Sequence, residues 1–133
     1  FVAAASKGLG KAVAMRLAEE GANVSICARD SEVLESAVAE ISAAASTGRV
    51  FGIPADLTQA DDIERIGHEL EKEMKGVDIL VNNAGGPSPG VFESLSDRDW
   101  QDAFELTLMS TVRLTRLMLP HMRAQKWGRI INI

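Results

Sequence analysis

The first twenty residues constrain the fold of this chain more than any other stretch. Phe1 and Val2 suit a buried strand, a run of small residues follows, and Gly8 and Gly10 lead into a helical pattern over residues 11–20. Glycines at such positions let the backbone turn and let a helix pack tightly against a sheet. The free N–H groups at the start of that helix attract anions, most often a phosphate. The stretch therefore predicts a strand, an anion-binding turn and a helix.

The spacing of these glycines does not identify a dinucleotide site by itself. In the general fingerprint Gly-x-Gly-x-x-Gly the third glycine would fall at Val13. A plain strand–turn–helix corner is the alternative for this stretch alone, so the rest of the chain has to decide between the two.

Composition excludes several classes of protein. The chain of 133 residues is enough for one domain and has a formal net charge of −5 without a basic stripe, which argues against nucleic acid as a partner. No apolar run approaches the roughly 18 residues of a membrane span. Cys27 is the only cysteine, so we interpret it as a small buried hydrophobe and expect a cytoplasmic protein. Phe1 and Ile133 both fall within expected strands, which predicts a domain over residues 1–133 truncated at both ends.

Short apolar runs alternate with helical patterns along the rest of the chain. The runs expected to form the remaining strands are residues 23–28, 50–54, 78–82 and 129–133. Helices are expected from residues 29–31 to a small-residue loop at 42–48, from Thr58, and from Ser96 to about Pro120. A short helical turn can follow Pro120, and Trp127 and Gly128 would end it. Thr58 and Ser96 each stand three residues before an aspartate, so we predict a capping box at the start of both helices.

This alternation predicts an α/β fold with a doubly wound, Rossmann-like parallel sheet and helices on both faces. Strands that are continuously apolar are typical of parallel sheets covered on both sides. In the doubly wound order the first strand lies beside the fourth at the switch point, and ligands bind above the carboxyl ends of the strands there. We therefore expect the functional site at that edge of the sheet.

Several stretches, taken together, resemble the short-chain dehydrogenase/reductase family. Residues 3–10 take the register of its first turn, Thr-Gly-x-x-x-Gly-x-Gly, and residues 82–85 match its Asn-Asn-Ala-Gly motif. Asp56 and Leu57 match its adenine-contacting position. The remaining matches, in the last long helix and the last strand, are Trp100, Phe104, Pro120, Met122 and residues 128–133.

The resemblance implies hydride transfer between a nicotinamide cofactor and a carbonyl or alcohol substrate. Residues 1–133 would be the NAD(P)-binding Rossmann domain of a reductase similar to the 3-oxoacyl-(acyl carrier protein) reductases. Sugar or other alcohol dehydrogenases of the same family, and a non-catalytic dinucleotide-binding or oligomerisation module, are the alternatives. A methyltransferase of similar topology is disfavoured by Ala28 and Arg29, because it would need an acidic residue at the end of the second strand.

The resemblance also implies which residues hold the cofactor. The N–H groups near Leu9 and Gly10 would face the pyrophosphate. Asp56 would accept a hydrogen bond from the adenine amino group, or would serve only as a turn residue ahead of the helix. Asn83 to Gly85 would border the adenosine ribose or be mainly structural. The expected cofactor-binding residues are Ala4, Ala5, Ser6, Lys7, Gly8, Leu9, Gly10, Arg29, Asp56, Leu57, Asn83, Ala84 and Gly85.

Basic residues favour NADP(H) over NAD(H) as the cofactor. Lys7 precedes Gly8 in the first turn, and Arg29 follows the second strand, so both side chains are expected near a ribose 2′-phosphate. Ser6 would add a hydroxyl. The rival interpretation, in which Asp30 binds the ribose of NAD, is weaker because an aspartate there more often caps the following helix.

The chain departs from the family pattern at three places. Ala3 and Ala4 replace Thr and Gly, and since alanine resists a positive φ we expect ordinary dihedrals at Ala4. Thr107 stands where the family has an active-site Asn, so it is a doubtful catalytic residue. The family's Ser, Tyr and Lys follow the fifth strand, and this chain has no Tyr. We expect these residues beyond Ile133 and expect residues 1–133 alone to be inactive.

The last long helix has apolar residues on more than one face, which predicts a homodimer or homotetramer built through it. Later helices of the same chain are the alternative cover for the second face. His68 and His121 have no partners at metal-ligand spacing, so we predict no metal site.

Overall fold

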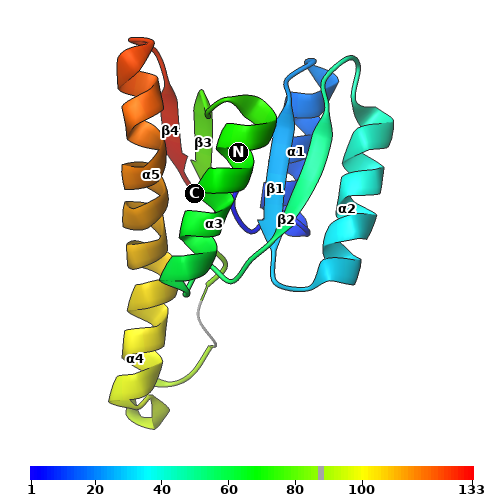
Figure 1. Ribbon diagram of the computed structural model, residues 1–133. Coiled ribbons are helices and arrows are strands. Elements are labelled where there is room, and N and C mark those ends of the chain that lie inside the picture. Colours follow the sequence, from blue (N-terminus) through cyan, green and yellow to red (C-terminus); the bar gives the residue numbers. More distant parts are fainter. Residues whose placement is uncertain (87–88) are drawn as a thin grey trace.

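A parallel sheet with helices on both faces forms the frame of the computed structural model, which describes residues 1–86 and 89–133 (Figure 1). The strands are β1 (Val24–Ala28), β2 (Val50–Pro54), β3 (Ile79–Asn82) and β4 (Arg129–Asn132). The helices are α1 (Gly8–Glu19), α2 (Ser31–Ala44), α3 (Ala60–Met74), α4 (Asp97–Phe104) and α5 (Ser110–Ala124). A 3₁₀ turn (Phe92–Ser94) precedes α4, and a π-helical segment (Glu105–Met109) joins α4 to α5.

The chain begins in the middle of the sheet. β1 pairs in parallel with β2, and β3 with β4. Between them Val2 forms parallel bridges to both Ile26 and Val81. The Val2 N–H donates to the Ser25 carbonyl at 2.9 Å, and the Ala3 N–H donates to the Val81 carbonyl at 2.9 Å. The order β2, β1, Val2, β3, β4 confirms the doubly wound sheet, although the first strand is reduced to one bridged residue.

The alternation of side chains across the sheet divides the buried residues into two cores. Val2, Ile26 and Val81 face α1 and α2, where they pack with Leu34 and Ile41. The intervening positions face α3 and α5 and pack with the apolar stripes of those helices. The buried residues of this second core include Phe1, Ala3, Cys27, Ile53, Ile63, Ile66, Leu70, Leu80, Leu114, Met118 and Met122.

The helices α3 and α5 approach closely on the second face. A Cβ at Gly67 would lie 2.8 Å from both Cδ atoms of Leu117, so a larger residue at this crossing would require the Leu117 side chain to move. α5 is thereby held against the sheet, while α4 extends beyond it (Figure 1).

The start of α3 differs from the expectation, and the predicted capping box at Thr58 is wrong. Thr58 donates its backbone N–H and its hydroxyl to Asp56 Oδ1, at 3.0 and 2.8 Å. The helix begins at Ala60, after Gln59 as N-cap. Thr58 bonds to the aspartate two residues upstream and not to Asp61, because a turn of this kind forms locally and needs no helix. The box at Ser96 and Asp99 is confirmed, with both of its hydrogen bonds present.

One of two helix ends differs from the expectation: α2 continues past its expected end, whereas α5 ends before Trp127, as expected. α2 continues to Ala44, so the first part of the predicted loop 42–48 is helical, since alanine is the strongest helix former. α5 continues past Pro120 to Ala124. Pro120 removes the N–H that would bind the Arg116 carbonyl, but both residues are exposed, so water can satisfy that carbonyl.

Candidate functional site

The first turn of the chain is tighter than the sequence led us to expect. Ala4 has a φ of 49°, so the prediction of ordinary dihedrals at this alanine is wrong. A left-handed alanine costs roughly 1–2 kcal/mol. Asn83 offsets that cost, because its Nδ2 donates to the carbonyls of Ala3 and Ala4, at 3.3 and 3.2 Å. The Ala4 N–H in turn points at the Cys27 Sγ at 3.4 Å.

Gly10 lacks a Cβ and so allows the Asn83 side chain to pack directly against the first turn. A Cβ at Gly10 would lie 2.3 Å from Asn83 Nδ2 and 3.1 Å from the Ala5 Cα. α1 therefore begins directly above the carboxyl ends of the central strands. Lys7 is its N-cap and makes no side-chain cap, so the first N–H groups of the helix stay available to an anion.

A cavity of about 200 Å³ lies between this turn and the ends of β1 and β2. It brings together six of the predicted cofactor-binding residues, namely Ala4, Ser6, Arg29, Asp56, Leu57 and Gly85. Cys27, Ala28, Ala55, Gly86 and Leu106 complete its lining.

The other predicted cofactor-binding residues do not line this cavity. Ala5 and Gly10 are buried, and Asn83 and Ala84 are half-buried. Lys7, Gly8 and Leu9 are exposed at the start of α1.

The carboxylate of Asp56, which lines the cavity, has one engaged oxygen and one without a hydrogen bond in the described residues. Oδ1 accepts both hydrogen bonds from Thr58. Within residues 1–86 and 89–133, no hydrogen bond reaches Oδ2, so this atom can accept one from a ligand.

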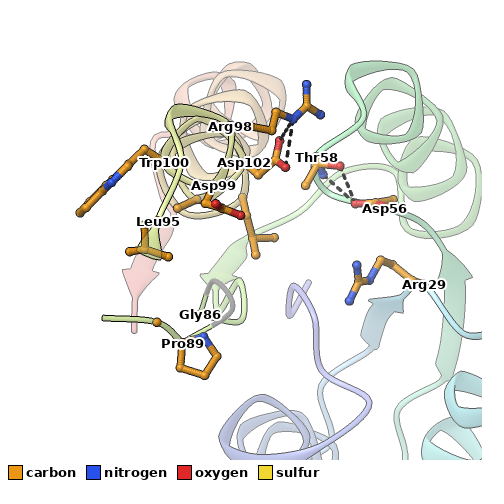
Figure 2. A pocket seen from close by; sticks show the side chains of 13 residues that line it. Arg29, Asp56, Thr58, Gly86, Pro89, Leu95, Arg98, Asp99, Trp100 and Asp102 are labelled. Atoms are coloured by element: carbon orange, nitrogen blue, oxygen red, sulfur yellow. Dashed lines mark hydrogen bonds and ion pairs between the residues drawn. The ribbon is translucent and has the colours of Figure 1, made fainter. Parts of the chain in front are cut away.

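A larger cavity of about 610 Å³ adjoins the first and is shown in Figure 2. Arg29, Asp56 and Thr58 line it from the strand ends. From α4 it is lined by charged side chains and by two apolar ones, namely Arg98, Asp99, Asp102, Trp100 and Ala103. Arg98 Nε pairs with Asp102 Oδ1 at 2.9 Å. The residues that line both cavities are Arg29, Asp56, Gly86 and Leu106.

Two titratable groups near the site have shifted pKa values. Burial raises the pKa of the Cys27 thiol to about 11, so the thiol stays protonated and unreactive at neutral pH. Hydrogen bonds from the side chain and the backbone of Ser96 hold the pKa of Asp99 below its usual range.

Asp30 lies next to Arg29 but serves the helix. Its Oδ1 accepts from the Val33 N–H at 3.0 Å, which makes it the N-cap of α2. The expectation that Asp30 is a cap is confirmed by this contact.

Thr107 lies in the π-helical segment and is exposed. Its hydroxyl donates to the Ala103 carbonyl at 2.7 Å, and Thr107 lines neither cavity. Its neighbour Leu106 lines both, and no signal in the sequence pointed to that residue. A signal did exist for the role of Thr58. The Asp-x-Thr spacing of Asp56 and Thr58 is typical of a local turn, whereas we had interpreted Thr58 as a helix cap.

The histidines lie apart from the cavities. His68 is exposed on α3, and His121 Nε2 lies 3.2 Å from Asp78 Oδ1. Within the described ranges, no three His, Cys, Asp or Glu side chains cluster in a way that would hold a metal ion. In the same part of the chain, no helix is long and apolar enough to span a membrane.

Comparison with known proteins gives matches over the whole chain. The family model described as short chain dehydrogenase matches residues 1–133. Nodulation protein G of Rhizobium sp. (strain N33) is 40% identical over 133 residues, which are 100% of this chain and 52% of that protein. The 3-oxoacyl-[acyl-carrier-protein] reductase FabG of Staphylococcus epidermidis is 32% identical over 134 residues, or 100% of this chain and 54% of that protein. The chain thus spans about half the length of the curated relatives it matches.

Solved structures agree with these matches. L-sorbose reductase from Gluconobacter frateurii, complexed with NADPH and L-sorbose, superposes with a TM-score of 0.92 at 33% identity. The match covers 98% of this chain and 49% of that one. A metagenomic short-chain oxidoreductase in complex with NADP gives a TM-score of 0.87 at 34% identity, covering 98% and 59%.

Proposed function

This chain belongs to the short-chain dehydrogenase family, and from that premise we propose that residues 1–133 form the cofactor-binding domain of an NADP(H)-dependent oxidoreductase. The observation that carries the proposal is the cavity at the strand ends, where Ser6, Arg29 and Asp56 meet. A cation, a hydroxyl and a carboxylate with one free oxygen are the groups that a phosphorylated adenosine needs.

Each part of the cavity has a role in this proposal. The N–H groups of Leu9 and Gly10 bind the pyrophosphate at the start of α1. Arg29, helped by Ser6 and Lys7, binds the 2′-phosphate, because Ala28 supplies no acid that would repel it. Asp56 Oδ2 accepts from the adenine amino group. Asn83 acts indirectly, because it holds the carbonyls of Ala3 and Ala4 and so keeps the turn open to the ligand.

The reaction in this proposal is hydride transfer between NADP(H) and a carbonyl or alcohol. When bound, the nicotinamide supplies or accepts the hydride, and residues 1–133 hold and orient it. Reduction of a ketone also needs a proton donor near neutral pH. The family's Ser, Tyr and Lys supply it, and we place them outside residues 1–133, which contain no Tyr.

Two substrate classes have support. A 3-oxoacyl thioester is supported by the similarity to the Staphylococcus epidermidis reductase. A ketose is supported by the similarity to the structure complexed with L-sorbose. Turnover of each substrate by the full-length protein with NADPH, measured by loss of absorbance of the reduced nicotinamide, separates the two classes.

We also propose that the full-length protein is a cytoplasmic homodimer or homotetramer formed through α4 and α5. Phe92, Trp100, Phe104 and Leu108 are all exposed by 46% or more, and so much apolar surface in one stretch is typical of an interface. Light scattering at micromolar concentration tests this. A monomeric mass would mean that other residues of the same chain cover the surface.

Calorimetry on the full-length protein tests the cofactor. A partly exposed charge-assisted contact to the 2′-phosphate gives NADPH a tenfold to few-hundredfold advantage in Kd over NADH, about 1.4–3 kcal/mol. Arg29→Ala should remove most of that advantage. Arg49→Ala is the matched control, because Arg49 is also exposed but precedes β2 and pairs with Glu73 at 2.9 Å. Equal affinity for the two cofactors, or a ratio that Arg29→Ala leaves untouched, contradicts the proposal.

A further inference from the structure

We infer that Asp62, assisted by Arg65, is a positioning residue for the adenosine end of the cofactor, an inference that rests on the proposed function. Both residues lie in the first turns of α3 and line neither cavity. They act on the ligand through Asp56.

The carboxylate of Asp62 joins the helix to the loop that carries Asp56. Asp62 Oδ2 accepts from the Asp56 backbone N–H at 2.7 Å. Its other oxygen, Oδ1, is bound by Arg65 Nη2 at 2.6 Å. The same nitrogen of Arg65 donates to the Pro54 carbonyl at 2.7 Å. One ion pair therefore connects α3, the last residue of β2 and the backbone of Asp56.

The remaining contacts of the loop fix the direction of the Asp56 side chain. Thr58 holds Oδ1, and the Gln59 N–H donates to the Asp56 carbonyl at 2.9 Å. The Ala55 N–H donates to the Ala28 carbonyl at 2.9 Å, which ties the loop to the end of β1. Only Asp62 and Arg65 tie the loop to α3 among these contacts. Removing them keeps the turn but leaves the Asp56 N–H without its partner, so the loop can shift relative to the helix and has to be positioned when the ligand binds.

The negative charge of Asp62 also favours its role in positioning the Asp56 loop. The Asp56 N–H and the Arg65 guanidinium hold the pKa of Asp62 below its usual range, so the carboxylate is ionised at neutral pH. Asp61 offers a matched control, because it also lies in the first turn of α3 and is exposed. In the described part of the chain its side chain makes no hydrogen bond or ion pair, so replacing it changes the helix charge without touching the loop.

Calorimetry on the full-length protein with two fragments of the cofactor tests the inference. Adenosine 2′,5′-bisphosphate reports on the Asp56 loop, and reduced nicotinamide mononucleotide reports on the rest of the cofactor site. Asp62→Ala should weaken the bisphosphate by about fivefold to thirtyfold and leave the mononucleotide within about twofold. Asp61→Ala should leave both within about twofold.

Two further variants keep the test decisive if Asp62→Ala does not fold. Asp62→Asn keeps an oxygen for the Asp56 N–H, and Arg65→Met keeps the Asp62 carboxylate, so each should weaken the bisphosphate alone, by about twofold to fivefold. Unchanged bisphosphate affinity, or an equal loss for both fragments, would overturn the positioning role. Failure of the unmutated protein to bind the bisphosphate would instead overturn the proposed cofactor, and the inference with it.

Discussion

The strand β1, near the middle of the sheet, and the segment from residue 89 to residue 109, here called the arm, expose their apolar side chains to very different degrees. In β1 the first four residues are buried. In the arm no residue is buried, and Phe92 and Trp100 are exposed by 75% and 53%. These two rings pack edge to face with centroids 6.1 Å apart, so they partly cover each other. The contrast shows that apolar composition indicates which side chains need a partner, while the surroundings decide whether one is present.

The largest effect on stability should come from replacing a buried leucine outside the arm, and an exposed leucine in the arm provides the comparison. Leu114 in α5 is 1% exposed, and Leu108 in the π-helical segment is 50% exposed. Leu114→Ala should lower the free energy of unfolding by about 3 kcal/mol, because it leaves a cavity in the core. Leu108→Ala should cost less than about 1 kcal/mol. Urea unfolding of the full-length protein measures both. An equal cost would show that the arm is covered in solution.

A pair of glycines at the site tests the contrast between a closely packed position and an open one. Gly10→Ala places a Cβ against Asn83 and Ala5 and should cost about 1–3 kcal/mol of stability. For Gly85→Ala, no atom of residues 1–86 and 89–133 lies within 4 Å of the new Cβ, so it should change stability by less than about 0.5 kcal/mol. Thermal unfolding compares the two variants. A neutral Gly10→Ala would mean that Asn83 can leave the first turn, and the Ala4 conformation should then change as well.

A smaller effect on stability is expected when the pH is lowered. Hydrogen bonds from Gln125, then from His121, hold the pKa of Asp78 below its ordinary value of 3.8. Because the folded pKa is the lower one, this carboxylate stabilises the fold above about pH 4, and the contribution is lost as pH falls through the folded pKa. Asp78→Asn should therefore flatten the acid side of a plot of urea midpoint against pH.

The matched variant in the arm is Asp99→Asn. The pKa of Asp99 is also lowered, by Ser96, but this capping box serves only the start of α4. Its removal should lower the helicity of the arm and leave the midpoint of global unfolding nearly unchanged at every pH. A shift as large as that of Asp78→Asn would show that the arm unfolds together with the sheet.

The smallest effect is expected at Thr107. Its hydroxyl is engaged with the Ala103 carbonyl, so Thr107→Val should lower kcat of the full-length enzyme by well under tenfold, less than about 1.4 kcal/mol in activation free energy. Thr111→Val is the control, since the Thr111 hydroxyl donates to the Thr107 carbonyl in the same manner, at 3.1 Å. A hundredfold loss for Thr107→Val alone, with folding intact, would assign Thr107 to a proton relay.

Local patterns predicted most of the secondary structure and two of its caps. The Ser96 box and the Asp30 cap formed as expected, because each depends on residues within three positions of each other. The Thr58 box failed although it has the same pattern, because Asp56 offered the threonine a closer acceptor. Two local signals competed there, and the pattern alone did not rank them.

At the site the sequence predicted the residue types better than their arrangement. Ser6, Arg29 and Asp56 do line one cavity, while Lys7 lies outside it on the exposed start of α1. Leu106 was not predicted as a lining residue of the cavities, because it lies in the π-helical segment some fifty residues after Asp56. Side chains that distant in sequence meet only through the packing of whole elements.

The sequence by itself determined the parallel α/β sheet and its order, and it predicted the edge at which we propose that a ligand binds, because hydrophobic periodicity and small-residue turns act over a few residues. Only the tertiary structure decided the conformation of Ala4. An alanine alone avoids a positive φ, and Asn83, which lies 79 positions away, supplies the hydrogen bond that makes it favourable. The tertiary structure also decided which apolar side chains are buried, since burial depends on what packs against each face of a helix.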